Sequence, residues 1–169
     1  MKYLKIIFAI GIISGLIGCN KMTYKRFTSN QGWLIFDYPS TWTQSLEDEG
    51  TYVFMDNDNW KGNFRITPLR ISGKDKDSID SNLLEYLDEQ VSKNKGAKYL
   101  KLGQYDVANY IKAIVQDDDN LTIIYWLFGK NQTMITASFT IDSNRFDDKD
   151  VKKQIRLCEK ILETLKIEK

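Results

Sequence analysis

Residues 121–141 read LTIIYWLFGKNQTMITASFTI, and this stretch decides the fold of the chain. Residues 121–128 are apolar on both faces of an extended chain, which predicts a central strand that is covered on both sides. Residues 129–131 are turn formers. From Thr133 to Ile141, apolar side chains alternate with Thr and Ser, the pattern of a half-buried strand. The stretch is therefore predicted to form two sequential strands joined by a turn.

Further strands are predicted on the N-terminal side of this pair. They share an enrichment in aromatic and β-branched residues between turn signals, and they cover residues 33–38, 51–55, 63–71, 98–102 and 107–116. In the stretch 63–71, the apolar positions change phase at Pro68. Because side chains alternate along a strand, this phase change predicts a bulge or a bend at Pro68.

Two stretches switch to helical spacing. In residues 78–95 the apolar positions are Ile79, Leu83, Leu84, Leu87 and Val91. In residues 147–166 they are Val151, Ile155, Cys158, Leu162 and Leu165. The order of strands, helix, strands and helix predicts an α+β fold, with a largely antiparallel β-sheet flanked by two main α-helices.

The residue types limit the chemistry of the domain. The chain has no histidine and two cysteines, Cys19 and Cys158. A Ser-His-Asp or Cys-His system is therefore excluded, and the usual zinc sites lose their ligands. Cys158 lies in the apolar stripe of the last helix, which favours a buried small side chain over a reactive thiol. We expect no enzyme, no catalytic residues and no cofactor, although a carboxylate pair brought together in space remains an alternative.

The run Asp56-Asn57-Asp58-Asn59 has the oxygen-rich composition of a calcium loop. An EF-hand would need an oxygen donor and then glycine in the next two positions, but Trp60 and Lys61 stand there. A polar turn is therefore expected, with no metal ligands. Trp60 follows this turn and precedes Lys61-Gly62, so it is our candidate partner-binding residue, exposed at a loop tip. The alternative is that the Trp60 ring folds back to cap the core.

The N-terminal segment has the parts of an export signal. Lys2 and Lys5 precede an apolar run over residues 6–17, which is too short to span a bilayer. Leu16-Ile17-Gly18-Cys19 resembles the bacterial lipobox. The resemblance implies a lipoprotein signal peptide over residues 1–18, and a Cys19 that becomes the N-terminus and carries lipid chains such as palmitate. Residues 19–31 are polar and predict a tether, which leaves a single domain over 32–169.

The N-terminal strand ends in Phe36-x-Tyr38-Pro39-x-x-Trp42. With the element order, this corner resembles the PsbP-like α/β/α sandwich, a fold found in several small bacterial lipoproteins. The resemblance implies a non-enzymatic accessory role, because members of this fold mostly act as assembly factors or binding modules.

Net charge gives little information about partners. The first 18 residues hold two of the 24 basic residues and none of the 23 acidic ones, so the rest of the chain has a formal charge of −1. This balance gives no reason to expect nucleic acid or an anionic membrane surface as a partner. The expected partners are the bilayer, through acylated Cys19, and a protein of unknown identity.

We therefore expect a membrane-anchored envelope lipoprotein whose soluble domain binds a protein or small ligand without catalysis, as an assembly or accessory factor. Two alternatives stay open. One is an immunity lipoprotein that neutralises a toxin delivered into the periplasm, and the other is a carboxylate-dependent hydrolase. The residue after Cys19 is Asn20 and not aspartate, and no acidic run follows. The expected location is therefore the outer membrane, facing the periplasm.

Overall fold

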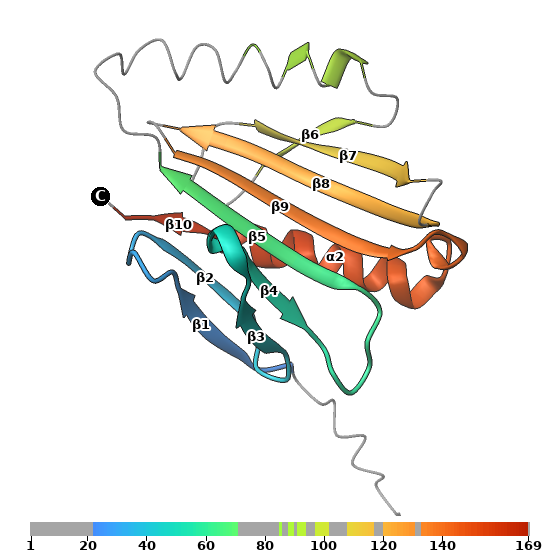
Figure 1. The fold of residues 1–169 in the computed structure, drawn as a ribbon, viewed down its shortest axis with the longest axis horizontal. Coiled ribbons are helices and arrows are strands. Elements are labelled where there is room, and N and C mark those ends of the chain that lie inside the picture. Colours follow the sequence, from blue (N-terminus) through green and yellow to red (C-terminus); the bar gives the residue numbers. More distant parts are fainter. Residues whose placement is uncertain are drawn as a thin grey trace, which may run out of the picture.

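The computed structural model describes residues 22–70, 97–101, 108–116, 120–130 and 133–168, together with six helical residues between 85 and 93. The described strands form two sheets. The small sheet has the order β1-β2-β10 and the large sheet has the order β3-β4-β5-β9-β8-β7-β6, and the described strands pair in antiparallel orientation. Figure 1 shows helix α2 and the small sheet behind the large one.

The bounds of the elements are as follows. The strands are β1 Tyr24–Thr28, β2 Leu34–Pro39, β3 Thr43–Leu46, β4 Tyr52–Met55, β5 Asn63–Arg70, β6 Lys98–Lys101, β7 Ala108–Gln116, β8 Leu121–Lys130, β9 Thr133–Asp142 and β10 Lys166–Ile167. The helix α2 spans Lys149–Glu163, and two 3-10 turns, η1 and η2, span Asp48–Gly50 and Ser143–Arg145. The predicted α+β class with a largely antiparallel sheet is confirmed.

The β8–β9 hairpin occupies the middle of the large sheet, as its sequence pattern predicts. The two strands pair without interruption from Leu121↔Asp142 to Lys130↔Thr133. β8 lies between β9 and β7 and buries Ile124, Trp126 and Phe128 on the face turned to α2. Every second residue of β9 is buried on the same face, because side chains alternate between the two faces of a strand. These buried residues are Ile135, Ala137, Phe139 and Ile141.

The expectation of a polar tether over residues 19–31 is wrong for residues 24–28. These residues form β1, which pairs with β2 from Tyr24↔Pro39 to Thr28↔Ile35. Phe27 is the one buried residue of β1, and its ring lies 4.6 Å from that of Phe36 and 4.7 Å from that of Tyr52. A single apolar side chain among polar ones gives no sequence periodicity, yet it is enough to hold an edge strand on the core.

The bulge expected at Pro68 is absent. β5 pairs with β9 in unbroken register from Asn63↔Thr140 to Arg70↔Thr133. Leu69 is exposed, so the change of apolar phase after Pro68 arises from an apolar residue on the solvent side of the strand and not from a bulge. The pairing of β4 with β5 extends only to Ile66 of β5. The missing N–H of Pro68 therefore removes no bond to β4.

Helix α2 confirms the second helical prediction. Val151, Cys158, Ile161 and Leu162 are buried in it, and Leu165 follows as a buried residue after its end. The Thr164 hydroxyl accepts a hydrogen bond of 2.9 Å from the backbone N–H of Asp37 in β2. Two residues later β10 begins, and it pairs with β2 on the side opposite β1. The C-terminus is therefore held in the small sheet.

Parts of the other predictions lie outside the described residues. Glu85, Asp88, Glu89 and residues 91–93 are helical, and the rest of the helix expected over 78–95 is outside the described part. So are the signal segment 1–18 and Cys19. In the portion of the chain that the structure describes, no helix is long and apolar enough to cross a membrane.

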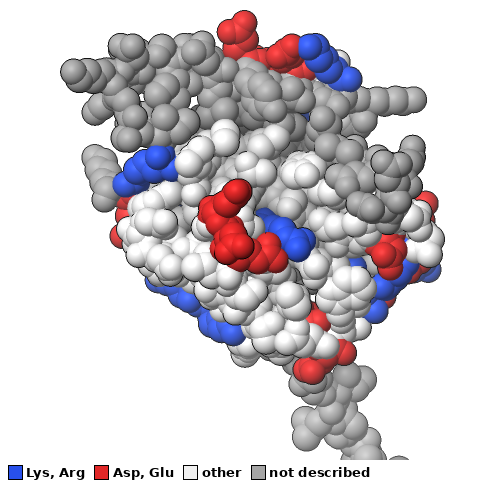
Figure 2. All heavy atoms as spheres, in the orientation of Figure 1, with Lys and Arg blue, Asp and Glu red and all other residues white. Residues whose placement is uncertain are grey.

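Rings from both sheets meet in the core between them. Phe27, Phe36 and Tyr38 project from the small sheet onto Phe54 of β4, and Phe64 and Trp126 continue the cluster along the large sheet. The opposite face of the large sheet is mostly uncharged where it is described (Figure 2). Its charges gather over η1, where Arg65 forms an ion pair with Glu47 at 3.3 Å.

Candidate functional site

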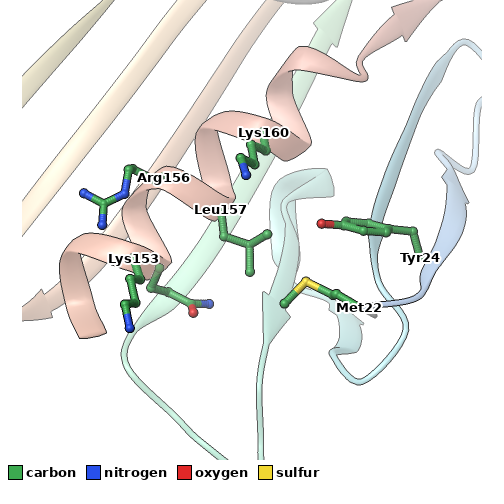
Figure 3. Close-up of a pocket in the computed structure, with 7 residues that line it drawn as sticks. Met22, Tyr24, Lys153, Arg156, Leu157 and Lys160 are labelled. Atoms are coloured by element: carbon green, nitrogen blue, oxygen red, sulfur yellow. The ribbon is translucent and has the colours of Figure 1, made fainter. Parts of the chain in front are cut away.

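A groove of about 450 Å³ lies between the start of β1 and the outer side of α2. Figure 3 shows Leu157 of α2 facing Met22 and Tyr24 across it, with Arg156 pointing away from them at the edge. Its lining includes Met22 and Tyr24 from the N-terminal segment, and Lys153, Arg156, Leu157 and Lys160 from α2. The lining contains no aspartate or glutamate. This groove therefore offers no carboxylate pair for acid–base catalysis.

Trp60 lies in the loop of residues 56–62 that joins β4 to β5. The Asn59 backbone N–H donates a hydrogen bond of 3.2 Å to Asp56 Oδ1, which closes the polar turn before Trp60. The Trp60 side chain is 45% exposed and stands outside the hydrophobic core. Its Nε1–H donates to Asn63 Oδ1 at 2.9 Å. The ring therefore lies at the surface with its nitrogen hydrogen-bonded to Asn63, and the alternative that it caps the core is wrong.

Two contacts fix the loop behind Trp60. Lys61 Nζ lies 2.7 Å from Asp150 Oδ2, which ties the loop to the start of α2. Gly62, at φ +153°, presses against β9. A Cβ built on Gly62 would stand 2.5 Å from Ile141 Cγ2 and 2.6 Å from the Thr140 carbonyl oxygen, so only glycine fits there. The exposed indole therefore stands on a loop attached to both a helix and a strand.

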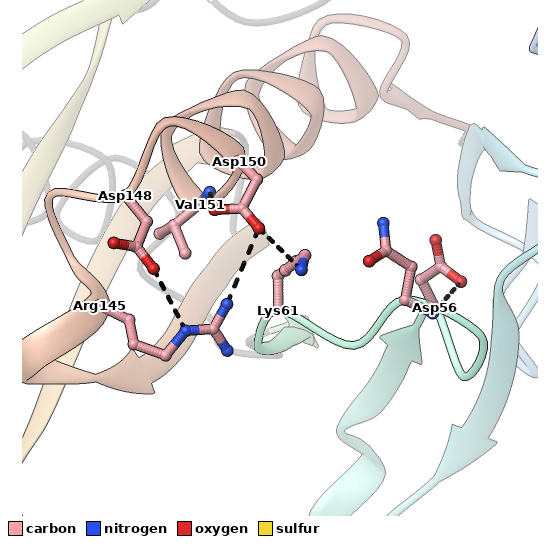
Figure 4. Close-up of polar contacts among 7 residues, drawn as sticks. Asp56, Lys61, Arg145, Asp148, Asp150 and Val151 are labelled. Carbon is pink, nitrogen blue, oxygen red and sulfur yellow. Dashed lines mark hydrogen bonds and ion pairs between the residues drawn. The ribbon is translucent and has the colours of Figure 1, made fainter.

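The Lys61–Asp150 contact belongs to a polar cluster at the N-terminal end of α2 (Figure 4). Arg145 Nε lies 3.4 Å from Asp148 Oδ2, and Arg145 Nη2 lies 3.9 Å from Asp150 Oδ2. The Val151 backbone N–H donates to Asp150 Oδ1 at 2.9 Å. The pKa of Asp150 is lowered, first by the hydrogen bond from Lys61; desolvation opposes this, and the Val151 N–H and the Lys61 charge add to it.

Replacing Lys61 tests this attachment. In Lys61→Met the donor and the charge are lost while the length of the side chain is kept, so the pKa of Asp150 should rise towards its ordinary value. The lowered pKa of Asp150 stabilises the folded protein at pH values above the ordinary pKa of the carboxyl group, and this contribution disappears in acid as the group is protonated. The variant should therefore lose stability at neutral pH but not at low pH. Titration of the Asp150 carboxyl carbon by NMR measures the shift.

Lys152→Met is the matched control for this titration. Lys152 also pairs with a carboxylate, that of Asp147 at 2.9 Å, but it does not contact Asp150. The control should leave the Asp150 pKa in place. An Asp150 titration that is the same in Lys61→Met as in the unchanged protein would show that the loop is not held by this ion pair.

Two titratable groups on α2 are partly or wholly removed from water. Cys158 is fully buried, and burial raises the pKa of its thiol well above the ordinary value. This confirms a structural cysteine, because the reactive form is the thiolate. Desolvation also raises the pKa of Glu159, against the opposing charges of Lys98 and Arg156. The buried Trp126 Nε1–H has no partner of normal hydrogen-bond geometry among the described atoms, although it lies near enough to Glu159 to favour the carboxylate.

The sequence singled out Cys19 and Trp60, and the structure shows only the second. Cys19 lies outside the described residues, three positions before Met22. The groove was missed because two of its seven lining residues, Met22 and Tyr24, belong to the segment taken for a tether. One signal was present: Lys153, Arg156 and Lys160 are spaced by three and four residues, which places them on one side of a helix.

Comparison with solved structures supports the PsbP-like fold. A crystal structure from Bacteroides thetaiotaomicron is 25% identical with a TM-score of 0.63, and the match covers 88% of this chain. The chain spans half the length of that protein. Cyanobacterial PsbP (CyanoP) from Synechocystis is 14% identical with a TM-score of 0.51, over 89% of this chain and 96% of the other.

The Ran-binding protein Mog1p of Saccharomyces cerevisiae is 9% identical with a TM-score of 0.50, over 86% of this chain and 96% of the other. These two distant likenesses show the fold alone. No curated protein sequence matches the chain. A family model matches residues 22–169, which is nearly all of the sequence and includes β1. The chain therefore belongs to the family described as "Domain of unknown function (DUF3805)".

Proposed function

We propose that this protein is a lipoprotein of the bacterial envelope whose domain binds a partner protein without catalysis, as an assembly or accessory factor. The N-terminal signal pattern and the lipobox-like residues before Cys19 support the anchor. The near-neutral charge of the remaining chain favours a protein partner over nucleic acid. Asn20 after Cys19 supports placement in the outer membrane, facing the periplasm.

The exposed Trp60, hydrogen-bonded through its indole N–H, is the observation on which the binding role rests. A tryptophan side chain removes a large apolar area from water when a partner covers it. An anchor residue is most effective when little conformational freedom is lost on binding. Trp60 meets this condition, because Asn63 holds its indole and Lys61 and Gly62 hold its loop. Tryptophan is also among the residues enriched in binding hot spots.

Site-specific cross-linking in living cells tests this role. The photo-reactive residue benzoylphenylalanine replaces Trp60 in one strain and Tyr99 in another. Tyr99 is the matched control because it is also an aromatic residue with 45% exposure, on β6. We expect a discrete protein adduct from position 60 and none from position 99. With the captured partner purified, Trp60→Ala should weaken binding by about 30-fold or more, the size of a hot-spot loss.

The outcomes separate the proposal from its alternatives. An adduct with a component of an envelope assembly system supports the accessory role, and an adduct with a secreted toxin supports the immunity role. Equal adducts from positions 60 and 99, or adducts of position 60 with lipid only, would contradict a protein-binding role for Trp60.

A further inference from the structure

The groove between β1 and α2 has an apolar floor and a basic border. Met22 and Tyr24 are each about half exposed, and Leu157 is partly buried beside them. Lys153 and Lys160 stand along the α2 side (Figure 3). Exposed apolar side chains next to cations are typical of segments that lie in the interface of a bilayer. There the apolar groups contact the acyl chains and the cations contact the lipid phosphates.

The cations of this border are not held in ion pairs within the described part of the domain, although the charge of Arg156 also acts on Glu159. Lys153, Arg156 and Lys160 are exposed, and none of them forms a salt bridge with a carboxylate among the described residues. Six other cations do form such pairs: Arg26, Lys61, Arg65, Lys93, Arg145 and Lys152. The formal charge of −1 beyond residue 18 is a sum over the rest of the chain, so it does not reveal this local group of three cations.

The groove begins three residues after Cys19. Three residues of extended chain span at most about 11 Å. A bilayer has about 5–8 Å of headgroup on each side of its hydrocarbon core. A lipid on Cys19 therefore holds Met22 at or immediately above the headgroups, whatever path the chain takes between them. The border of the groove is then within reach of the lipid phosphates.

We propose that this groove is the membrane-facing surface of the domain and binds anionic lipid headgroups. Lys153, Arg156 and Lys160 contact the lipid phosphates, and Met22 and Tyr24 enter the headgroup layer. The inference rests on the proposed lipid anchor and adds to it an orientation of the domain. Each basic side chain near an anionic surface contributes about a fivefold preference. Three together favour this orientation by roughly 100-fold at low salt.

Oxidative footprinting of the reconstituted protein tests the proposal. The full chain is produced in a bacterial envelope, extracted in detergent and inserted into vesicles of phosphatidylcholine, with or without phosphatidylglycerol. Hydroxyl radicals then label exposed side chains, and mass spectrometry reads each site. We expect Met22 and Tyr24 to be protected about fivefold or more when phosphatidylglycerol is present, and exposed again in high salt. Tyr99 should label equally in both vesicles.

Two variants with the same change of net charge separate this surface from charge in general. Lys153→Gln/Lys160→Gln removes two cations of the border and should weaken the orientation by about 25-fold, so that the labelling of Met22 increases towards its level in phosphatidylcholine vesicles. Lys93→Gln/Lys98→Gln removes two exposed cations elsewhere and should leave the protection unchanged. Figure 1 shows the described helical residues between 85 and 93 at the opposite end of the molecule from β1.

The mass of the N-terminal peptide separates failure of the anchor from failure of the surface. If residue 19 carries no acyl chain, the lipoprotein proposal fails and this inference fails with it. If residue 19 is acylated but Met22 and Tyr24 label alike in both vesicles, only the membrane-facing surface is overturned. Protection in native envelopes but not in phosphatidylglycerol vesicles would also overturn it, because the groove would then be covered by a protein.

Discussion

Replacing Phe54 with alanine should lower the free energy of unfolding by about 3–5 kcal/mol, the usual cost of removing a buried phenylalanine ring. Phe54 is fully buried on β4. Its ring centroid lies 5.3 Å from those of Phe27 and Phe36, 4.9 Å from that of Tyr38 and 6.3 Å from that of Phe64. The ring therefore joins the small sheet to the large one, and its removal leaves a cavity between two layers that cannot easily close.

Urea unfolding of the domain, residues 22–169, followed by circular dichroism measures this loss. Leu46→Ala is the control, because Leu46 belongs to the neighbouring strand β3 and is exposed. That change should stay within about 0.5 kcal/mol of the unchanged domain. Similar losses for the two variants would mean that the small sheet does not depend on the ring cluster for its position.

Gly62→Ala should cost about 3 kcal/mol, although it adds one methyl group in a loop. The added Cβ would meet Ile141 Cγ2 at 2.5 Å and Phe139 Cζ at 2.6 Å, as well as the Thr140 carbonyl oxygen at 2.6 Å. The two side chains belong to the packed face of β9 and the third atom is backbone, so the loop must move. The φ of +153° adds a strain that glycine does not have.

Gly50→Ala separates these two causes. Gly50 also has a positive φ, +77°, but a Cβ there would meet nothing within 4 Å. It should therefore lose only about 1 kcal/mol, from backbone strain alone. The difference between the two variants, measured by the same urea titration, is the cost of the close approach to β9. If the two losses are equal, Gly62 is needed for its conformation and not for contact.

The parts of the fold that the sequence predicts are those with a repeated local pattern. The β8–β9 hairpin alternates or is continuously apolar over many residues, and α2 has a five-residue stripe. β1 has one buried residue, Phe27, and β3 has none, so neither gives a pattern. β10 is two residues long and exists because the end of α2 returns the chain to β2. Such elements are set by tertiary contacts.

The same distinction applies to the candidate site. The exposure of Trp60 was one of the two alternatives that the neighbouring turn formers left open, the other being a ring folded back on the core. Its attachment was not, because Lys61 meets Asp150 and Gly62 meets β9, partners that are remote in the sequence. The groove likewise joins residues 22 and 24 to α2. Only the basic spacing along α2 was visible beforehand, and spacing alone does not show that a second segment lies opposite.

The order β1-β2-β10 has a mechanical consequence. The first and last strands of the domain occupy opposite edges of one central strand. A pulling force applied at the N-terminus enters through β1 and reaches the rest of the domain mainly across the five residue pairs that join β1 to β2, and also through the Phe27 ring, which packs on Tyr52 and Phe54 of β4. From β2 it passes through the aromatic rings to the large sheet, while β10 lies off this path. Tension between a tethered N-terminus and a bound partner would therefore act first on the hydrogen bonds between β1 and β2, and the C-terminal strand β10 would bear none of it.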